Sequence, residues 1–74
     1  MNELTPLEEV LVQEILQRGS VKEALNSLSW EESKGYSILF RIRRRRTKAR
    51  RLEKRLRGLE KRSPVLAKVL MVIE

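Results

Sequence analysis

The 74-residue chain contains no cysteine and no histidine, and it has only three glycines, two prolines and three aromatic residues. Without cysteine it can form neither disulfides nor thiolate metal sites. Without histidine it lacks the commonest metal ligand and the commonest general base at neutral pH. The sequence also shows no Gly-rich phosphate loop and no pair of catalytic carboxylates. We therefore expect no enzyme activity, no metal, no cofactor and no small-molecule ligand.

Long apolar runs are absent as well. No segment reaches the roughly 20 apolar residues of a membrane span. The polar, acidic start of the chain is unlike a signal or transit peptide, so a cytoplasmic protein without membrane contact is expected. A chain of this length buries a thin core, and small scaffolds often take their missing stability from a partner. A second copy of the chain is the expected partner.

Positive charge is concentrated in one segment, although the formal net charge of the chain is only +7. Residues 1–40 carry seven acidic and three basic side chains, whereas residues 41–62 carry thirteen basic and two acidic ones. A solvated helix surface would normally pair its cations with glutamates four residues away, and these are nearly lacking here. The segment therefore indicates a polyanionic partner.

Capping signals predict two short helices at the start of the chain. The run Thr5-Pro6-Leu7-Glu8 combines a capping box with proline at the first helical position, which predicts a helix over 6–18 that ends at Gly19. Ser20 begins a second capping box, which predicts a helix over 21–28. Apolar residues recur at helical spacing in both segments.

The rest of the chain predicts one long helix and one short helix. Residues 31–61 contain no proline and keep apolar residues at helical spacing, so we expect one continuous basic helix, loosened at Gly35. Ser63 and Pro64 end it and start a short apolar helix that needs covering. The expected fold is all-α: a helix-turn-helix with a long basic third helix and a short apolar C-terminal helix, as a dimer.

Two runs carry a resemblance to a known family. Gly19-Ser20-Val21-Lys22-Glu23-Ala24-Leu25-Asn26-Ser27-Leu28 and Tyr36-Ser37-Ile38-Leu39-Phe40-Arg41-Ile42-Arg43-Arg44-Arg45 resemble helix-turn-helix domains of the sigma-factor region 4 type. The layout, with a basic zipper-like helix behind the motif, also resembles small regulators of archaeal plasmids and viruses. The turn reads Ser29-Trp30-Glu31, where such motifs often have glycine, an aliphatic residue and serine. The resemblance implies a helix-turn-helix unit over residues 1–46.

The resemblance implies that the first turns of the third helix reach base edges. Serine and tyrosine hydroxyls can donate and accept there, and lysine can reach guanine acceptors or phosphate. The arginine cluster that follows is suited to phosphate, which guanidinium groups bind bidentately. The predicted DNA-binding residues are Ser33, Lys34, Tyr36, Ser37, Arg41, Arg43, Arg44, Arg45, Lys48 and Arg51. Trp30 and Phe40 are expected in the core, which disfavours a single-strand binder.

Residues 47–74 are expected to pair two chains. Ile42, Ala49, Leu56 and Ser63 repeat every seven residues, as do Arg45, Leu52, Leu59 and Leu66, which is a coiled-coil spacing. The predicted dimerisation residues are Leu52, Leu56, Leu59, Leu66, Val69, Leu70 and Ile73. The alternative is an intramolecular hairpin in which the C-terminal segment folds back onto the first and third helices.

The leading functional hypothesis is a sequence-preferring double-stranded DNA-binding protein that regulates transcription, or copy number in a plasmid or virus. One alternative is an RNA- or ribosome-associated basic helical protein, since long arginine-rich helices bind folded RNA by charge and shape. Another is a small accessory subunit of a DNA-processing enzyme. Preference for duplex in a competition titration separates the first two.

Overall fold

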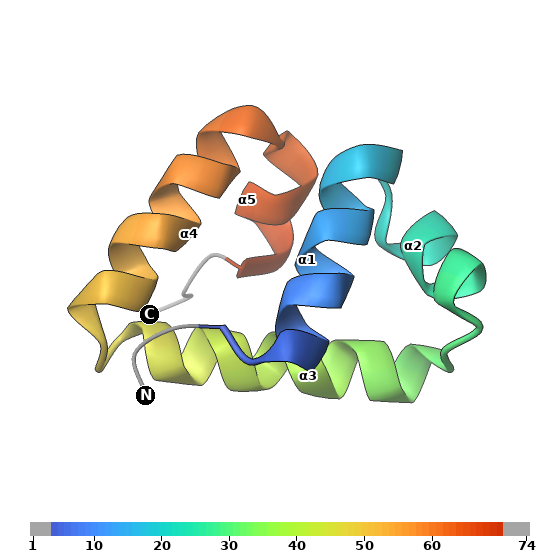
Figure 1. The fold of residues 1–74 in the computed structure, drawn as a ribbon, viewed down its shortest axis with the longest axis horizontal. Helices are drawn as coiled ribbons and strands as arrows, with labels where there is room; N and C mark the ends of the chain where they lie inside the picture. Colours follow the sequence, from blue (N-terminus) through green and yellow to red (C-terminus); the bar gives the residue numbers. More distant parts are fainter. Residues whose placement is uncertain (1–3, 71–74) are drawn as a thin grey trace.

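The computed structural model describes residues 4–70, and this range is all-α (Figure 1). Its helices are α1 (Pro6–Arg18), α2 (Val21–Leu28), α3 (Glu32–Arg46), α4 (Arg50–Arg62) and α5 (Pro64–Leu70). No helix within the described range is long and apolar enough to cross a membrane.

The predicted bounds of the first two helices are confirmed. The Thr5 hydroxyl accepts from the Glu8 backbone N–H, and the Glu8 carboxylate accepts from the Thr5 N–H, which completes the capping box of α1. Gly19 ends α1 with φ at +71°, a left-handed conformation that glycine adopts without a Cβ penalty. Ser20 then caps α2 by accepting from the Glu23 N–H. Local sequence therefore determines both helices.

The α2–α3 connection is the turn Ser29–Glu31. Ser29 has φ at +58° and ψ at +37°, so it adopts the left-handed conformation without being glycine. Trp30 donates its backbone N–H to the Leu25 carbonyl, which satisfies the end of α2. The turn then enters α3, which crosses α2 closely.

Gly35 lies at this crossing. It is buried, and a Cβ added there would lie 2.3 Å from Cδ2 of Leu25. The glycine therefore does not loosen α3, as the sequence suggested; it allows the backbone of α3 to approach α2.

The prediction of one continuous helix over 31–61 is wrong. α3 ends at Arg46, residues 47–49 turn the chain, and α4 begins at Arg50. The Thr47 hydroxyl donates to the Arg44 carbonyl at 2.9 Å, and Ala49 is extended with φ at −129° and ψ at 107°. α4 consequently folds back instead of extending away.

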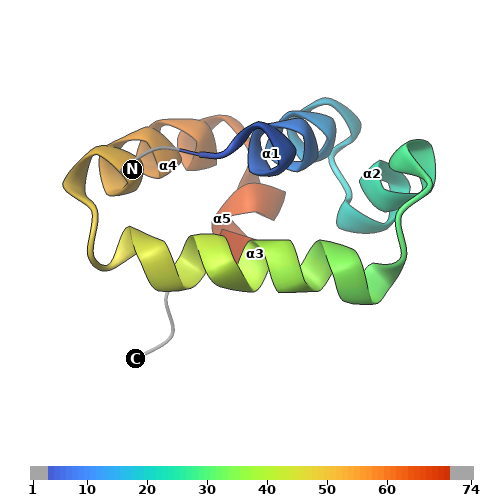
Figure 2. The ribbon, with the colours of Figure 1, turned by 60° about the horizontal axis from the view of Figure 1, so that its bottom comes forward.

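Folding back gives the chain one shared core. α5 lies between α4 and α1 in Figure 1, and Figure 2 shows α3 running along the opposite side of the molecule from α1 and α4. α1 contributes Leu11, Val12 and Ile15, and α3 contributes Ile38, Leu39 and Ile42, to the same buried cluster as the leucines of α4 and α5. The intramolecular hairpin, which was the alternative for the C-terminal segment, is the arrangement found.

The leucines expected to pair two chains are buried inside one chain. Leu52, Leu56, Leu66 and Leu70 are 0% exposed, and Leu59 is 8% exposed. Val69 is half-buried against the same core, and Ile73 lies outside the described residues. The coiled-coil spacing thus reflects the apolar face that α4 and α5 turn toward α1 and α3, and these leucines are not available as a contact between chains.

Candidate nucleic-acid interface

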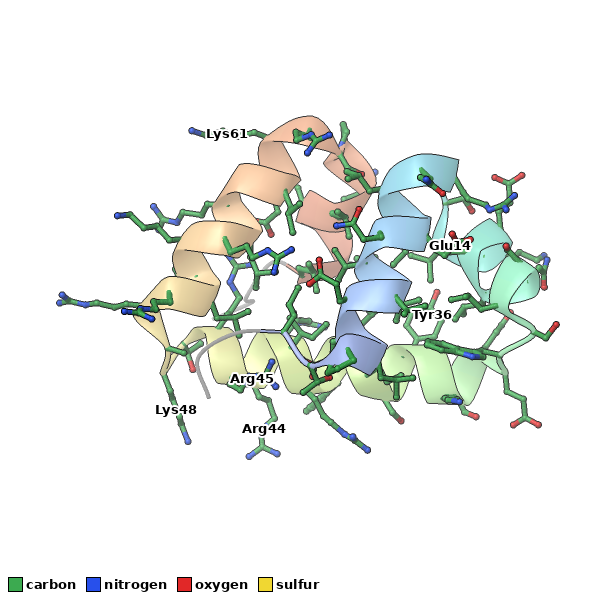
Figure 3. The ribbon with its side chains drawn as sticks, viewed as in Figure 1. Glu14, Tyr36, Arg44, Arg45, Lys48 and Lys61 are labelled. Atoms are coloured by element: carbon green, nitrogen blue, oxygen red, sulfur yellow. The ribbon has the colours of Figure 1, made fainter. Side chains whose placement is uncertain are left out.

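The side of α3 opposite the core is exposed along its whole length. Gly35, Ile38, Leu39, Ile42 and Arg46 form its buried side. The exposed residues on the other side recur at helical spacing, and we call them the α3 face: Ser33, Tyr36, Ser37, Phe40, Arg41, Arg44 and, in the turn that follows, Lys48. Arg44 and Lys48 project together from the lower edge of the molecule in Figure 3. Six of these seven residues are predicted DNA-binding residues.

The chemistry of the α3 face changes along the helix. Its first half is polar and aromatic, and its second half is basic. Ser33, Tyr36, Ser37, Phe40 and Arg41 line a shallow depression where the two halves meet. No acidic residue occurs between positions 33 and 48. The face therefore combines hydrogen-bonding groups, two aromatic rings and unopposed positive charge.

The prediction that Phe40 is a core residue is wrong. Phe40 is 48% exposed and Tyr36 is 53% exposed, whereas Trp30 is half-buried against the core as expected. The Arg44 guanidinium carbon lies 5.7 Å from the centre of the Phe40 ring, a cation–π distance. Gly35 and Arg46 both lie on the buried side of α3, which the sequence alone does not show. With these two positions facing the core, Phe40 falls on the exposed side, and the prediction fails for that reason.

The other predicted residues of α3 lie beside the face or away from it. Lys34 is exposed, and its Nζ lies 4.6 Å above the centre of the Trp30 ring. Arg43 is half-buried at the opposite border of the face. These two side chains flank the α3 face rather than forming its centre.

Arg45 points toward α1, so its assignment to a DNA contact is not supported by its position. Its guanidinium makes a bidentate pair with Glu8, with Nη1–Oε2 at 3.0 Å and Nη2–Oε1 at 2.5 Å. Burial acts to raise the pKa of Glu8, but the hydrogen bonds from Arg45 and Thr5 outweigh it and hold that pKa below its usual value. Arg45 therefore joins α3 to the capped start of α1.

Arg46 is the most heavily engaged cation of the described chain. Its side chain is 7% exposed and donates to Glu53 at 2.7 Å, to Glu60 at 2.8 Å and to the carbonyl of Leu70 at 2.5 Å. The hydrogen bond to Glu53, followed by the interactions with Glu60, raises the pKa of Arg46 above its ordinary value. This one guanidinium connects the end of α3 with α4 and with the last turn of α5.

Arg51, the remaining predicted DNA-binding residue, is exposed on α4 and so lies on a different helix from the α3 face. Sequence reasoning placed Arg50 in the arginine cluster but missed Lys54 and Lys61, which share the exposed side of α4 with Arg50. Their spacing of four and seven residues was a usable signal. A continuous helix over 31–61, however, gives these residues the wrong orientation relative to the core.

Comparison of this chain with protein-family models, with curated proteins and with solved structures gives no match. The function must therefore be inferred from the geometry and charge of the chain itself.

Proposed function

We propose that the chain is a sequence-preferring double-stranded DNA-binding protein that places the α3 face in the major groove. The observation that carries this proposal is the face itself, which is exposed, polar at its start, basic at its end and without acidic residues. A 15-residue helix is about 22 Å long, and the major groove, about 12 Å wide, admits a helix of this diameter.

The order of the first three helices supports a helix-turn-helix interpretation. α2 and α3 are joined by a three-residue turn, and α1 packs on both. Ser29 occupies the left-handed conformation at the position where such motifs often have glycine. In a helix-turn-helix unit the second helix of the motif enters the groove with its first residues on base edges. Ser33 and Ser37 would then contact bases, and Arg44 and Lys48 would contact phosphates.

Phe40 gives the proposed interface an apolar contact as well. Apolar side chains, phenylalanine included, contact the methyl group of thymine in the major groove. Because Phe40 lies between the polar and basic halves of the face, such a contact would fall inside the bound site rather than at its edge. The exposed ring is thus compatible with duplex recognition.

The proposal is tested by selecting bound sequences from random duplexes and then titrating two variants. Removing three cations, in Arg41→Ala/Arg44→Ala/Lys48→Ala, should weaken binding to all duplexes and reduce the slope of log K against log salt by about 2.7. Ser37→Ala should leave that slope unchanged and relax the preference for the selected sequence by about 1–3 kcal/mol at one base pair. Failure to enrich any sequence, or a slope unaffected by the triple substitution, would contradict the proposal.

A second candidate function is single-stranded nucleic-acid binding, and the exposure of Tyr36 and Phe40 favours it. Aromatic rings among cations form a stacking platform, worth about 1–3 kcal/mol per stacked base. The two rings lie one helical turn apart on the α3 face, beside Arg41 and Arg44. A competition between duplex and single strand of one sequence decides between the two functions. In addition, Phe40→Ala should lower the affinity of a single-strand binder for homopolymers and for mixed sequences alike.

The folded-back arrangement removes the main argument for the RNA-binding alternative. That alternative was inferred from one long arginine-rich helix, whereas α3 and α4 are separate helices. A role in regulating transcription, or copy number in a plasmid or virus, remains the biological setting that we propose.

The proposed contact between the α3 face and a duplex needs only one chain. If two chains do pair, Leu7 and Val10 on α1, 44% and 43% exposed, are large apolar side chains still open to such a contact.

A further inference from the structure

A second row of cations runs along the outer side of α4. Arg50, Lys54, Arg57 and Lys61 are spaced by four, three and four residues, so they share one side of the helix, and all are exposed. We call these residues the α4 stripe. It spans twelve residues of helix, from Arg50 to Lys61, or about 16 Å along the axis. The stripe lies on the opposite side of α4 from Leu52, Leu56 and Leu59, which are buried.

The stripe keeps most of its positive charge because the two acidic residues of α4 are engaged mainly by Arg46. Glu53 and Glu60 turn inward and accept from Arg46. Arg57 also pairs with Glu53, at 2.7 Å. The other three stripe residues make no ion pair with any residue in the range 4–70. A row of like charges one turn apart destabilises a helix unless an anion binds it.

Gly58 adds an independent observation. It is exposed in the interior of α4, and a Cβ built there would have nothing within 4 Å. An interior helical glycine is unfavourable relative to alanine, yet nothing in the described chain requires this one. It lies between the exposed cations Lys54 and Lys61 and leaves the backbone uncovered, so a large ligand can approach the helix closely.

The α4 stripe and the α3 face point to different sides of the molecule. α4 starts near the C-terminal end of α3 and rises away from it (Figure 1). Arg44 and Lys48 project from the lower edge, whereas Lys61 lies at the opposite, upper side (Figure 3). A straight duplex against the α3 face therefore runs along one edge and does not reach the far end of the stripe.

We propose that the α4 stripe binds the phosphate backbone of a second duplex, so that one chain bridges two DNA segments. The inference rests on the proposed function, since it takes the first duplex to lie on the α3 face. The occupant is a polyanion because the stripe offers several cations and no aromatic or apolar contact. Phosphates spaced along a duplex match such a row, and binding would be sequence-indifferent and strongly salt-dependent.

A capture experiment tests the bridge with two variants of equal charge change. The α4 variant is Arg50→Ala/Lys54→Ala/Lys61→Ala, and the α3 variant is Arg41→Ala/Arg44→Ala/Lys48→Ala. A selected duplex is fixed to beads, the protein is bound, and retention of a second, fluorescent duplex of unrelated sequence is measured. Circular dichroism checks that both variants are folded, which is expected because all six residues are exposed.

The native chain should retain the second duplex, and the α4 variant should bind the first duplex nearly as the native chain does while retention of the second falls about tenfold or more. Retention that the α4 variant leaves unchanged overturns the bridge. The bridge is also overturned if the α4 variant binds a single 40-base-pair duplex more weakly than the native chain does but binds a 20-base-pair duplex equally well. The stripe would then contact the flank of the same duplex. If the α3 variant bound the first duplex with the affinity of the native chain, the proposed function would be overturned instead.

Discussion

Two glycines in helix interiors should respond in opposite ways to the same substitution. At Gly35 an added Cβ would lie 2.3 Å from Cδ2, 2.8 Å from Cδ1 and 3.1 Å from Cγ of Leu25. At Gly58 nothing lies within 4 Å. Both glycines are in α-helices, so replacing either one with alanine raises the intrinsic stability of its helix by about 1 kcal/mol. The difference between the two variants therefore isolates the contact with Leu25.

The size of that difference follows from the packing around Leu25. This side chain is 2% exposed, and three of its carbon atoms crowd the new methyl group, so it cannot rotate away without displacing the core. Overpacking of this kind costs about 1–3 kcal/mol. Gly35→Ala should then lower the free energy of unfolding by up to about 2 kcal/mol, whereas Gly58→Ala should raise it by about 1 kcal/mol.

Thermal unfolding followed by circular dichroism at 222 nm measures the effect, with urea titrations providing the free energies. For a domain of this size, 1 kcal/mol shifts the melting temperature by about 4–8 °C, so the two variants should be clearly separated. A third variant, Gly35→Ala/Leu25→Ala, removes the clash. Its loss of unfolding free energy should be smaller than the sum of the losses in Gly35→Ala and in Leu25→Ala. If Gly35→Ala proved as stabilising as Gly58→Ala, the close approach of α2 and α3 at Leu25 would be refuted.

Three further predictions concern the turn and the ion pairs. Ser29→Gly should raise the free energy of unfolding by about 1 kcal/mol, because it removes a left-handed non-glycine residue, and Ser29→Ala serves as the control that should show no gain. Arg46→Ala should destabilise the fold by about 3–5 kcal/mol in urea unfolding, because Glu53 and Glu60 lose their shared partner. Hydrogen bonds from Arg46, then Arg57, lower the pKa of Glu53 to about 2 from 4.5. Its stabilising contribution should thus be complete above pH 4.5 and disappear as the pH falls toward 2, and Glu53→Gln should flatten the unfolding profile over that range.

Local signals in the sequence predicted the parts of the fold that depend on neighbouring residues. The caps at Thr5, Ser20 and Ser63 require only a side chain and a backbone N–H three residues away, and all three form as expected. The α3 face was also predicted in large part, because polar and basic residues at helical spacing leave few other orientations. The exposure of Phe40 was not.

The break at residues 47–49 could not be predicted from local signals alone. Only Thr47, whose hydroxyl competes for a backbone carbonyl, marks it in the sequence. Helical spacing continues on both sides of the turn, so the periodicity of the apolar residues is the same for one long helix and for two. Tertiary contacts decide between them, and the periodicity does not indicate which leucines those contacts bury.

Arg46 shows why the folded-back form is the one that satisfies the charges. In a continuous helix Glu53 would lie about 10 Å and Glu60 about 21 Å farther along the axis, so one guanidinium could not reach both. Only when α4 turns back do both carboxylates meet Arg46. The same turn brings Arg55 to Glu9 on α1.

These pairs determine where positive charge remains on the surface. Glu8, Glu9, Glu53 and Glu60 each accept from an arginine of the basic segment that lies on a different helix. These acidic residues therefore stabilise the fold, and among them only Glu53 also pairs with a residue of a basic surface, Arg57 of the α4 stripe. What is left exposed is positive on the α3 face and on the α4 stripe, which is the distribution that a protein needs if it is to hold two polyanions at once.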